Sequence, residues 1–308
     1  MNVQNPSASR GIAIQAVDLV KNYGTGSNMV HALRGVNVSF ERGKFTAIMG
    51  PSGSGKSTLM HTLAGLDSAT SGHILFGGAD LTRMNDKQLT LLRRHKIGFI
   101  FQSFNLLPMF TAEQNILMPL TLAGDKPDRA WFDLLVETLG LKQRLNHRPN
   151  ELSGGQQQRV AIARALITKP KLVFADEPTG NLDSVSSAEV LGFLKRSVNE
   201  LGQTIVMVTH DAVAASYADR AIVFADGQIV ADEQHPNAEV MNELLMAERE
   251  RTTRTTLTDT PADQMAQMAG VRNVPDLPIT DAPLPPAVPT SGCEGTLRHA
   301  RAAARHAR

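Results

Sequence analysis

Short, continuous apolar runs along the chain predict buried strands. The clearest four runs are residues 45–49, 97–101, 172–176 and 204–209, and each is followed by glycine or polar residues. Apolar runs of about four to eight residues are typical of strands in a parallel sheet that helices cover on both faces. The pattern therefore predicts a central, mainly parallel sheet.

Other segments predict antiparallel strands. Residues 12–17 indicate a first strand, and residues 36–40 alternate apolar with polar side chains, as in a half-buried strand. Residues 72–81 surround a Gly-Gly pair and residues 221–231 surround an Asp-Gly pair, and both pairs favour hairpin turns. The early strands are expected to form an antiparallel sheet at one side of the molecule.

Helical spacing of apolar residues appears in residues 112–122, 128–139 and 185–201. Residues 103–150 are expected to be helical overall, and three prolines, at positions 108, 119 and 127, are expected to break this region into separate segments. The sequence therefore predicts an α/β fold: a mainly parallel sheet with flanking helices, an antiparallel β subdomain and an α-helical subdomain at about residues 103–165.

The composition of the 308 residues is that of a soluble globular protein, with 42% hydrophobic and 20% charged residues. The net charge of +1 gives no argument for a nucleic-acid partner, and none is expected. The single cysteine, Cys293, excludes an internal disulfide framework. No apolar run is long enough to span a membrane, so a membrane role would need a second chain.

Both ends of the chain differ in composition from its middle. Residues 1–10 are polar, lack the apolar core of a secretion signal and are expected to be disordered. Residues 249–308 are rich in proline and lack aromatic residues, so they are expected to form a largely disordered tail. Its basic end, residues 298–308, could remain solvated or contact anionic lipid headgroups. The remaining residues, 11–248, are expected to form the folded domain.

One stretch fits the G-x-x-x-x-G-K-[ST] pattern of a phosphate-binding loop and lies between a predicted strand and a predicted helix. It consists of Gly50, Pro51, Ser52, Gly53, Ser54, Gly55, Lys56, Ser57 and Thr58. Its glycines allow backbone N–H groups to surround phosphate oxygens, and the helix start adds partial positive charge. Lys56 is expected to reach the β- and γ-phosphates, and the Ser57 hydroxyl to bind Mg²⁺. A glycine-rich turn that fits by chance is the alternative, and the flanking strand and helix argue against it.

A second anion-binding segment is predicted at Ser153, Gly154, Gly155 and Gln156. Ser153 is a suitable N-cap for the helix that follows, and two glycines at a helix start again expose N–H groups. One nucleotide needs only one such segment, so the second requires an explanation.

Polar residues end three of the predicted buried strands, where α/β proteins collect their ligand contacts. Asp176 suits Mg²⁺ coordination, Glu177 suits a general base acting on water, and His210 suits a contact with the γ-phosphate. Gln102 ends the strand at 97–101 and suits a ligand contact. Tyr23 could stack on a nucleobase. Each assignment has a structural alternative. The strand at 172–176 could simply leave into solvent, His210 could be structural, and Gln102 and Tyr23 could be ordinary loop residues.

The order of these motifs resembles that of the ATP-binding subunits of ABC transporters, over about residues 12–246. The resemblance implies a P-loop NTPase core that binds ATP with Mg²⁺ and hydrolyses it. It implies the Walker A loop at 50–57, the LSGGQ signature at 152–156, the D-loop at Asp183, the catalytic residues Glu177 and His210, adenine stacking on Tyr23, and Mg²⁺ ligands Ser57, Gln102 and Asp176.

The resemblance also explains the surplus anion site. In that family two ATPase domains face head to tail, so each ATP lies between the Walker A loop of one copy and the signature of the other. It therefore implies a homodimer that drives a separate integral membrane permease from the cytoplasmic side of the membrane. The helical subdomain would contact that permease, nearest the segment after Gln102.

A narrower resemblance points to the macrolide-export and lipoprotein-release group, and it rests on residues 49–60, 97–107, 156–159 and 176–184. The cell-division ATPase is a close relative of this group. Two alternatives are a soluble ABC ATPase acting on DNA or ribosomes and a regulatory module that binds nucleotide without turnover. The single ATPase copy and the absence of a long coiled-coil insert argue against the first, and Glu177 with His210 argues against the second. The sequence does not indicate a cargo.

Overall fold

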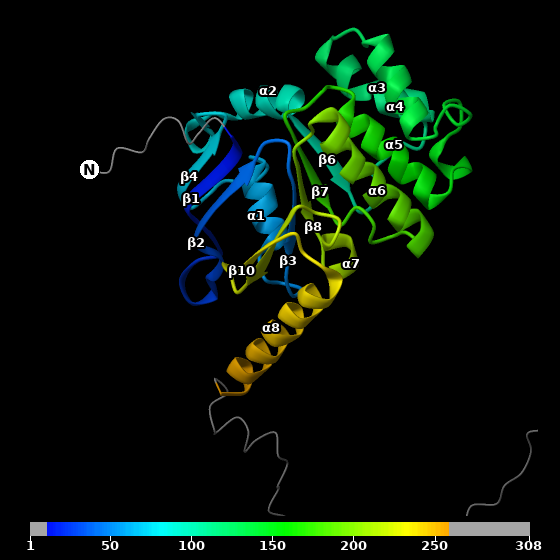
Figure 1. Cartoon of the computed structure of the whole chain (residues 1–308). Helices are drawn as coiled ribbons and strands as arrows, with labels where there is room; N and C mark the ends of the chain where they lie inside the picture. The colour runs from blue at the N-terminus through cyan, green and yellow to red at the C-terminus, as the bar shows by residue number, and fades with distance from the viewer. Residues whose placement is uncertain (1–10, 259–308) are drawn as a thin grey trace, which may run out of the picture. The chain divides into compact units, whose positions relative to one another are not determined.

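The computed structural model describes residues 11–258, so residues 1–10 and most of the predicted disordered tail at 249–308, namely 259–308, lie outside this range. Two sheets organise the described residues (Figure 1). The six-stranded sheet has the order β10 (Gln228–Gln234), β9 (Arg220–Ala225), β3 (Phe45–Met49), β8 (Ile205–Val208), β7 (Leu172–Asp176) and β6 (Ile97–Phe101). The four-stranded sheet has the order β2 (Val30–Glu41), β1 (Ile12–Tyr23), β4 (Ser71–Phe76) and β5 (Ala79–Asp80).

The six-stranded sheet is parallel except for β10, which forms an antiparallel hairpin with β9. This confirms the predicted mainly parallel sheet and its closing hairpin. Because β3, β7 and β8 run in the same direction, the residues that follow them meet at one edge. That edge carries the phosphate loop after β3, Glu177 after β7 and His210 after β8.

The four-stranded sheet is antiparallel, which confirms the predicted β subdomain. Its first strand is longer than residues 12–17, because β1 continues to Tyr23. The pairing of β1 with β2 shifts between Ala16 and Leu19, where Asp18 adopts a left-handed conformation with φ 47°. Asp18 is held there by Asn37, whose Oδ1 accepts from its backbone N–H at 2.9 Å. The irregularity explains why the alternation of apolar residues fades after residue 17.

The helices with their bounds are α1 (Lys56–Leu63), α2 (Asp86–Lys96), α3 (Ala112–Ala123), α4 (Arg129–Thr138), α5 (Gly154–Leu166), α6 (Ser184–Leu201), α7 (Ala212–Ala215) and α8 (Ala238–Thr258). Short 3₁₀ turns lie at Gly26–Asn28, Leu81–Arg83 and Pro149–Glu151. Figure 1 shows α1 beside the antiparallel strands and α3 to α6 on the other side of the parallel sheet. No helix in residues 11–258 combines the length and apolar content that crossing a membrane requires.

Two hydrophobic cores lie on the two faces of the parallel sheet. Side chains alternate between faces along a strand, so Ile48 of β3 packs with α1 and the antiparallel sheet, whereas Ala47 and Met49 pack with the helices opposite. The phosphate loop leaves β3 between these two cores. Its position is therefore fixed by packing on both sides of the strand that precedes it.

Two helices differ from the expectation. Pro119 lies inside α3 and does not end it, because α3 packs along α5 and this contact outweighs the local cost of proline. Helix α8 continues to Thr258, so residues 249–258 are helical, although the sequence placed the start of the disordered tail at residue 249. Met241 and Leu245 anchor α8 in the core, and the good helix formers at 247–251 carry it past residue 249.

Candidate nucleotide site

The phosphate loop depends on glycines at two positions of close approach. Gly50 has φ 150°, and a Cβ atom there would overlap the carbonyl oxygen of Phe224. Gly55 has φ 102°, and a Cβ atom there would lie 2.5 Å from the carbonyl oxygen of Ala32. Both positions therefore exclude any larger residue, and the loop holds its shape through contacts with β2 and β9.

Lys56 lies at the centre of this loop. Its side chain is buried, with an exposed fraction of 7%, and Nζ donates to the carbonyl oxygens of Gly50 at 2.9 Å and Pro51 at 2.6 Å. Burial lowers the pKa of Lys56, and the carboxylates of Glu177 and Asp176 oppose this effect. The ammonium group is therefore held in position to meet an anion that enters the loop.

Asp176 ends β7 beside the helix that follows the loop. Burial raises the pKa of its carboxyl group, and Glu177 adds to the rise, while His61 and a hydrogen bond from the Ser57 hydroxyl oppose it. A carboxylate and a hydroxyl side by side next to a phosphate site are hard oxygen donors that suit Mg²⁺. Across residues 11–258 there is no cluster of three histidine, cysteine or acidic residues that could hold a metal ion, so phosphate oxygens and water would have to complete the coordination.

Glu177 and His210 form a pair at the same edge. His210 Nδ1 lies 3.0 Å from Glu177 Oε1. Glu177 adopts a left-handed backbone with φ 44°, and its N–H donates to the carbonyl oxygen of Val208 at 2.9 Å. The backbone thus orients the Glu177 carboxylate, and the imidazole adds a second constraint. A carboxylate fixed in this way beside a phosphate site can take a proton from water.

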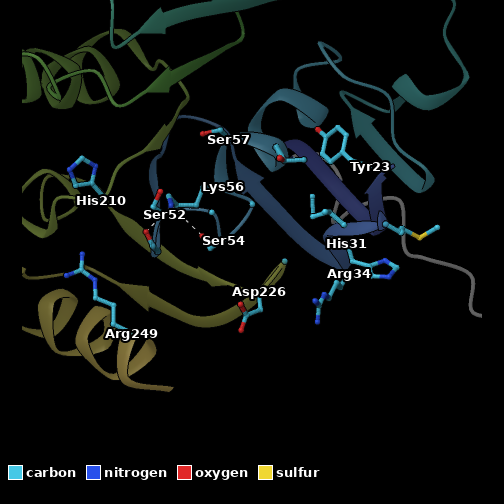
Figure 2. Close-up of a pocket in the computed structure, with 18 of the residues that line it drawn as sticks. Tyr23, His31, Arg34, Ser52, Ser54, Lys56, Ser57, His210, Asp226 and Arg249 are labelled. Carbon is cyan, nitrogen blue, oxygen red and sulfur yellow. Dashed lines mark hydrogen bonds between the residues drawn. The ribbon is translucent and has the colours of Figure 1, made fainter. Parts of the chain in front are cut away.

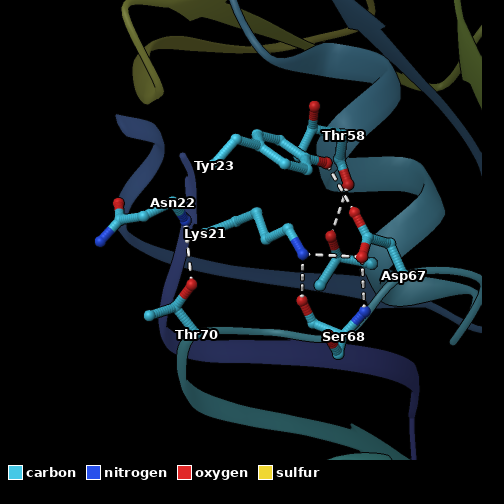
Figure 3. A network of polar contacts seen from close by, with 8 residues as sticks. Lys21, Asn22, Tyr23, Thr58, Asp67, Ser68 and Thr70 are labelled. Carbon is cyan, nitrogen blue, oxygen red and sulfur yellow. Dashed lines mark hydrogen bonds and ion pairs between the residues drawn. The ribbon is translucent and has the colours of Figure 1, made fainter. Parts of the chain in front are cut away.

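Tyr23 is held from two directions at the end of β1 (Figure 3). Its hydroxyl donates to Asp67 Oδ2 at 2.6 Å, and Lys21 Nζ lies 4.7 Å from the ring centroid. Burial and the hydrogen bond with Asp67 raise the pKa of Tyr23. Lys21 also donates to Asp67 Oδ1 at 2.7 Å and to the carbonyl oxygen of Ser68 at 2.7 Å. Tyr23 is 42% exposed, and its ring is therefore oriented in advance for stacking.

Except for Asp176, which does not line it, these groups meet in one cavity of about 960 Å³. The phosphate loop, Tyr23, Glu177 and His210 line it, and Figure 2 shows Tyr23 and Arg249 on opposite sides of the loop. Sequence reasoning missed Arg34, Asp226 and Arg249 in its wall. Asp226 could have been found, because it lies in the Asp-Gly hairpin turn, but Arg249 falls in the segment that was assigned to the tail.

Gln102 lies outside the wall of this cavity. Its side chain packs on Gly180, where an added Cβ atom would lie 2.6 Å from Gln102 Nε2. The Gln102 carbonyl oxygen accepts from Asn181 Nδ2 at 3.0 Å. The structure therefore places Gln102 against the segment that follows Glu177, beside the nucleotide site.

The second anion-binding segment lies apart from the cavity. Ser153 caps α5 as expected: its Oγ accepts from the Gln156 N–H at 3.3 Å, and its own N–H donates to Gln156 Oε1 at 3.1 Å. Gly155 faces Ser186 so closely that a Cβ atom would lie 2.8 Å from its Oγ. Asp183 caps α6, and Asp183 Oδ1 accepts from the Ser186 N–H at 2.9 Å. None of these residues lines the cavity that holds the phosphate loop.

Comparison with known proteins agrees with this site. The model of the family described as "ABC transporter" matches residues 33–180. The lipoprotein-releasing system ATP-binding protein LolD of Geobacter metallireducens is 49% identical over 221 residues, which cover 71% of this chain and 98% of LolD. The macrolide export ATP-binding/permease protein MacB of Syntrophobacter fumaroxidans is 49% identical over 220 residues, which cover 70% of this chain but only 31% of MacB.

A solved structure of similar fold is the ATP-binding cassette MJ0796, described as a dimer in a post-hydrolysis state bound to ADP and Pi. It is 39% identical, with a TM-score of 0.66, and the match covers 73% of this chain and 99% of that one. The chain belongs to the ABC transporter family, as an ATP-binding subunit. This confirms the family, the P-loop fold and the ATPase class that its motifs predicted.

Proposed function

We propose that this chain hydrolyses ATP between two copies of itself and uses the resulting change in shape to drive a separate membrane permease. The observation that carries the proposal is the convergence of the phosphate loop, Lys56, Glu177 and His210 on one cavity. A binding module without turnover would not need a carboxylate oriented beside the phosphate site. The resemblance to LolD and MacB favours lipoprotein release or macrolide export as the process that is driven.

In this proposal each residue of the site has a separate role. The loop N–H groups from Gly50 to Thr58 and the Lys56 ammonium bind the phosphates, and Tyr23 stacks on the adenine. Ser57, Asp176 and Gln102 would hold Mg²⁺, which neutralises developing charge on the phosphate oxygens. Glu177 takes a proton from the attacking water while the bond between the β,γ-bridging oxygen and the γ-phosphorus breaks. His210 positions Glu177 and contacts the γ-phosphate.

The proposed homodimer follows from the separation of the two anion-binding segments. Ser153 and its neighbours lie outside the cavity, so one chain does not supply both to one nucleotide. Docking of a second copy in head-to-tail orientation would bring the partner's signature segment to the open side of the cavity, with Asp183 nearby. The dimeric structures of MJ0796 support this arrangement. The test is the rate of phosphate release from the purified chain. This rate is expected to rise more steeply than linearly with protein concentration.

A permease contact is proposed for the groove between β6 and α3. Residues on both sides of Gln102 in the sequence, Phe101 and Asn105, line the groove. Phe99, Met118 and Leu122 line it too, together with Arg93 and Arg94. Leu122 is exposed and Phe99 and Met118 are half-buried, and such an apolar surface beside arginines suits an amphipathic helix of a partner. The chain would thus sit at the cytoplasmic side of the membrane, held there by the permease.

The alternative, a soluble ABC ATPase with a non-membrane partner, is not favoured by the similarity to transporter subunits. Co-expression with candidate permeases decides between the two. The proposal expects a permease to co-purify with the chain and to change its rate of phosphate release. A full rate of hydrolysis from a monomer that no permease affects would overturn it.

A further inference from the structure

A second cavity, of about 510 Å³, lies at the opposite edge of the parallel sheet from the nucleotide cavity. It is lined by residues that immediately precede parallel strands: Lys171 before β7 and Thr204 before β8. The nucleotide cavity, in contrast, is lined by residues that follow the same strands, such as Glu177 and His210. The two cavities therefore cannot share a ligand. We call the second one the Trp131 pocket, after the aromatic residue of α4 in its wall.

The indole of Trp131 is fixed in this wall. Its Nε1 donates to the carbonyl oxygen of Leu166 at 3.1 Å, and Lys169 Nζ lies 5.5 Å from the ring centroid. Phe76 and Pro170 add buried apolar surface on neighbouring sides. The pocket therefore offers a rigid, largely apolar surface that includes one flat aromatic group, as small-molecule sites commonly do.

The charges around this surface have one sign. Arg42, Lys169 and Lys171 line the Trp131 pocket, and no carboxylate does so among the residues that the structure describes. Lys169 is paired with Asp128 at 2.7 Å, so its charge is already matched. Arg42 uses Nε to reach the carbonyl oxygen of Ile12 at 3.1 Å, and the Lys171 ammonium has no side-chain partner within residues 11–258. Two positive charges thus face an apolar cavity.

We propose that the Trp131 pocket binds a small anion with a flat apolar body, such as an aromatic carboxylate, sulfonate or phosphate. The body would lie against Trp131 and Phe76, and its charged group would pair with Lys171 and Arg42. The volume falls within the range of about 300–1,000 Å³ that small-molecule sites occupy. The charges favour an anion, because its charged group would pair with Lys171 and Arg42, whereas a neutral ligand would gain no such pairing.

The test uses the tryptophan itself. Trp131 is the single tryptophan of the chain, so the indole emission has one source, in the wall of this pocket, and the pocket variants locate the bound probe. The probe is 1-anilinonaphthalene-8-sulfonate, a flat anion that accepts energy from an indole, added to the full chain in saturating ADP. The expected result is saturable quenching of Trp131, with binding about tenfold stronger than that of the uncharged analogue N-phenyl-1-naphthylamine. Equal binding of the two probes, or sulfonate binding that is present without ADP and lost in saturating ADP, would overturn the proposal.

Two variants test whether the cations of the pocket pair with the sulfonate group. Lys171→Gln and Arg42→Gln are each expected to weaken binding of the sulfonate about tenfold and leave binding of the uncharged analogue unchanged. The matched control is Lys142→Gln, which removes an exposed lysine that does not line the pocket. Unchanged binding in both pocket variants would contradict the proposal. Should either variant fail to fold, the comparison of the two probes on the unaltered chain still decides.

Discussion

The imidazole of His210 lies 3.0 Å from the carboxylate of Glu177, although 33 residues separate them in the chain. The contact exists because β7 and β8 are parallel neighbours whose ends meet at one edge of the sheet. Glu177 has a left-handed backbone with φ 44°, and it lines the same cavity as the phosphate loop. The proton acceptor of the proposed reaction is thus positioned by the fold before any nucleotide binds.

Glu177→Gln should bind MgATP normally and hydrolyse it about 10²–10⁴-fold more slowly, because the amide keeps the shape of the side chain but does not accept the proton. Phosphate release measures the rate, and light scattering is expected to show more dimer in MgATP. Turnover at the normal rate would remove Glu177 from its role. Glu189→Gln serves as control, because Glu189 lies in α6 outside the nucleotide cavity.

Ser153→Arg should leave ATP binding intact and abolish hydrolysis that depends on protein concentration, because a bulky cation would block the partner's nucleotide. The change also removes the N-cap of α5, which costs about 1 kcal/mol. Ser153→Asn is the control, since asparagine preserves the cap without adding charge. Hydrolysis that remains linear in protein concentration and survives the arginine would rule out the shared site.

Asp67→Asn should raise the KM for ATP several-fold with little change in kcat. Asp67 does not line the nucleotide cavity, but it holds the Tyr23 hydroxyl and the Lys21 ammonium. Loss of its charge would free the ring, so stacking on adenine would have to order it at each binding event. If Tyr23→Phe, which keeps the ring but loses the hydroxyl, gave the same KM as the unaltered chain, the hydroxyl contact would be irrelevant to binding.

Arg249→Gln should weaken binding of ATP several-fold, because Arg249 is a cation in the wall of the nucleotide cavity on α8. Arg251→Gln is the matched control: it lies on the same helix, pairs with Glu248 at 3.5 Å and does not line the cavity. Equilibrium titration with a fluorescent ATP analogue gives both affinities. Equal losses in the two variants would mean that general charge near α8, rather than this position, affects the nucleotide.

The contacts of Asp219 are expected to make the stability of the fold fall in acid. Its carboxylate accepts from Lys195 Nζ at 2.6 Å and from the Phe45 N–H at 2.9 Å, and although burial opposes them, these contacts lower its pKa below the ordinary 3.8. A lowered native pKa means that the stabilisation is complete above pH 3.8 and is lost as pH falls through the native value.

Asp219→Asn should therefore lower the urea midpoint at pH 7 and flatten its fall below about pH 4, since the native and unfolded states would then bind equal numbers of protons at this position. Urea denaturation followed by circular dichroism at the two pH values measures both effects. An unchanged midpoint at pH 7 would show that the contacts of Asp219 add no net stability.

Local sequence patterns predicted much of this fold. The apolar runs at 45–49 and 97–101 coincide with β3 and β6, and the Gly-Gly and Asp-Gly pairs form the turns of the two expected hairpins. In these segments burial and turn geometry are decided by residues close together in the chain. The phosphate loop was predictable for the same reason, because the glycines that its conformation requires are part of its sequence pattern.

What the patterns missed depends on distant contacts. The pairing of Asp18 with Asn37 allows β1 to continue to Tyr23 through an irregular register. The packing of α3 against α5 keeps Pro119 inside a helix. Arg249 reaches the nucleotide cavity because α8 extends beyond the composition change at residue 249. No pattern within ten residues contains any of this information.

The hydrogen bonds from Lys56 to its own loop have a thermodynamic consequence for the arrival of nucleotide. A free lysine side chain carries about 2 kcal/mol of rotamer entropy, and a site built on a free lysine would lose it on binding. Here folding has already ordered the side chain through Gly50 and Pro51. When phosphate enters, the Lys56 ammonium exchanges carbonyl acceptors for phosphate oxygens. The affinity for ATP is therefore reduced by the cost of this exchange and not by the cost of immobilising a lysine side chain.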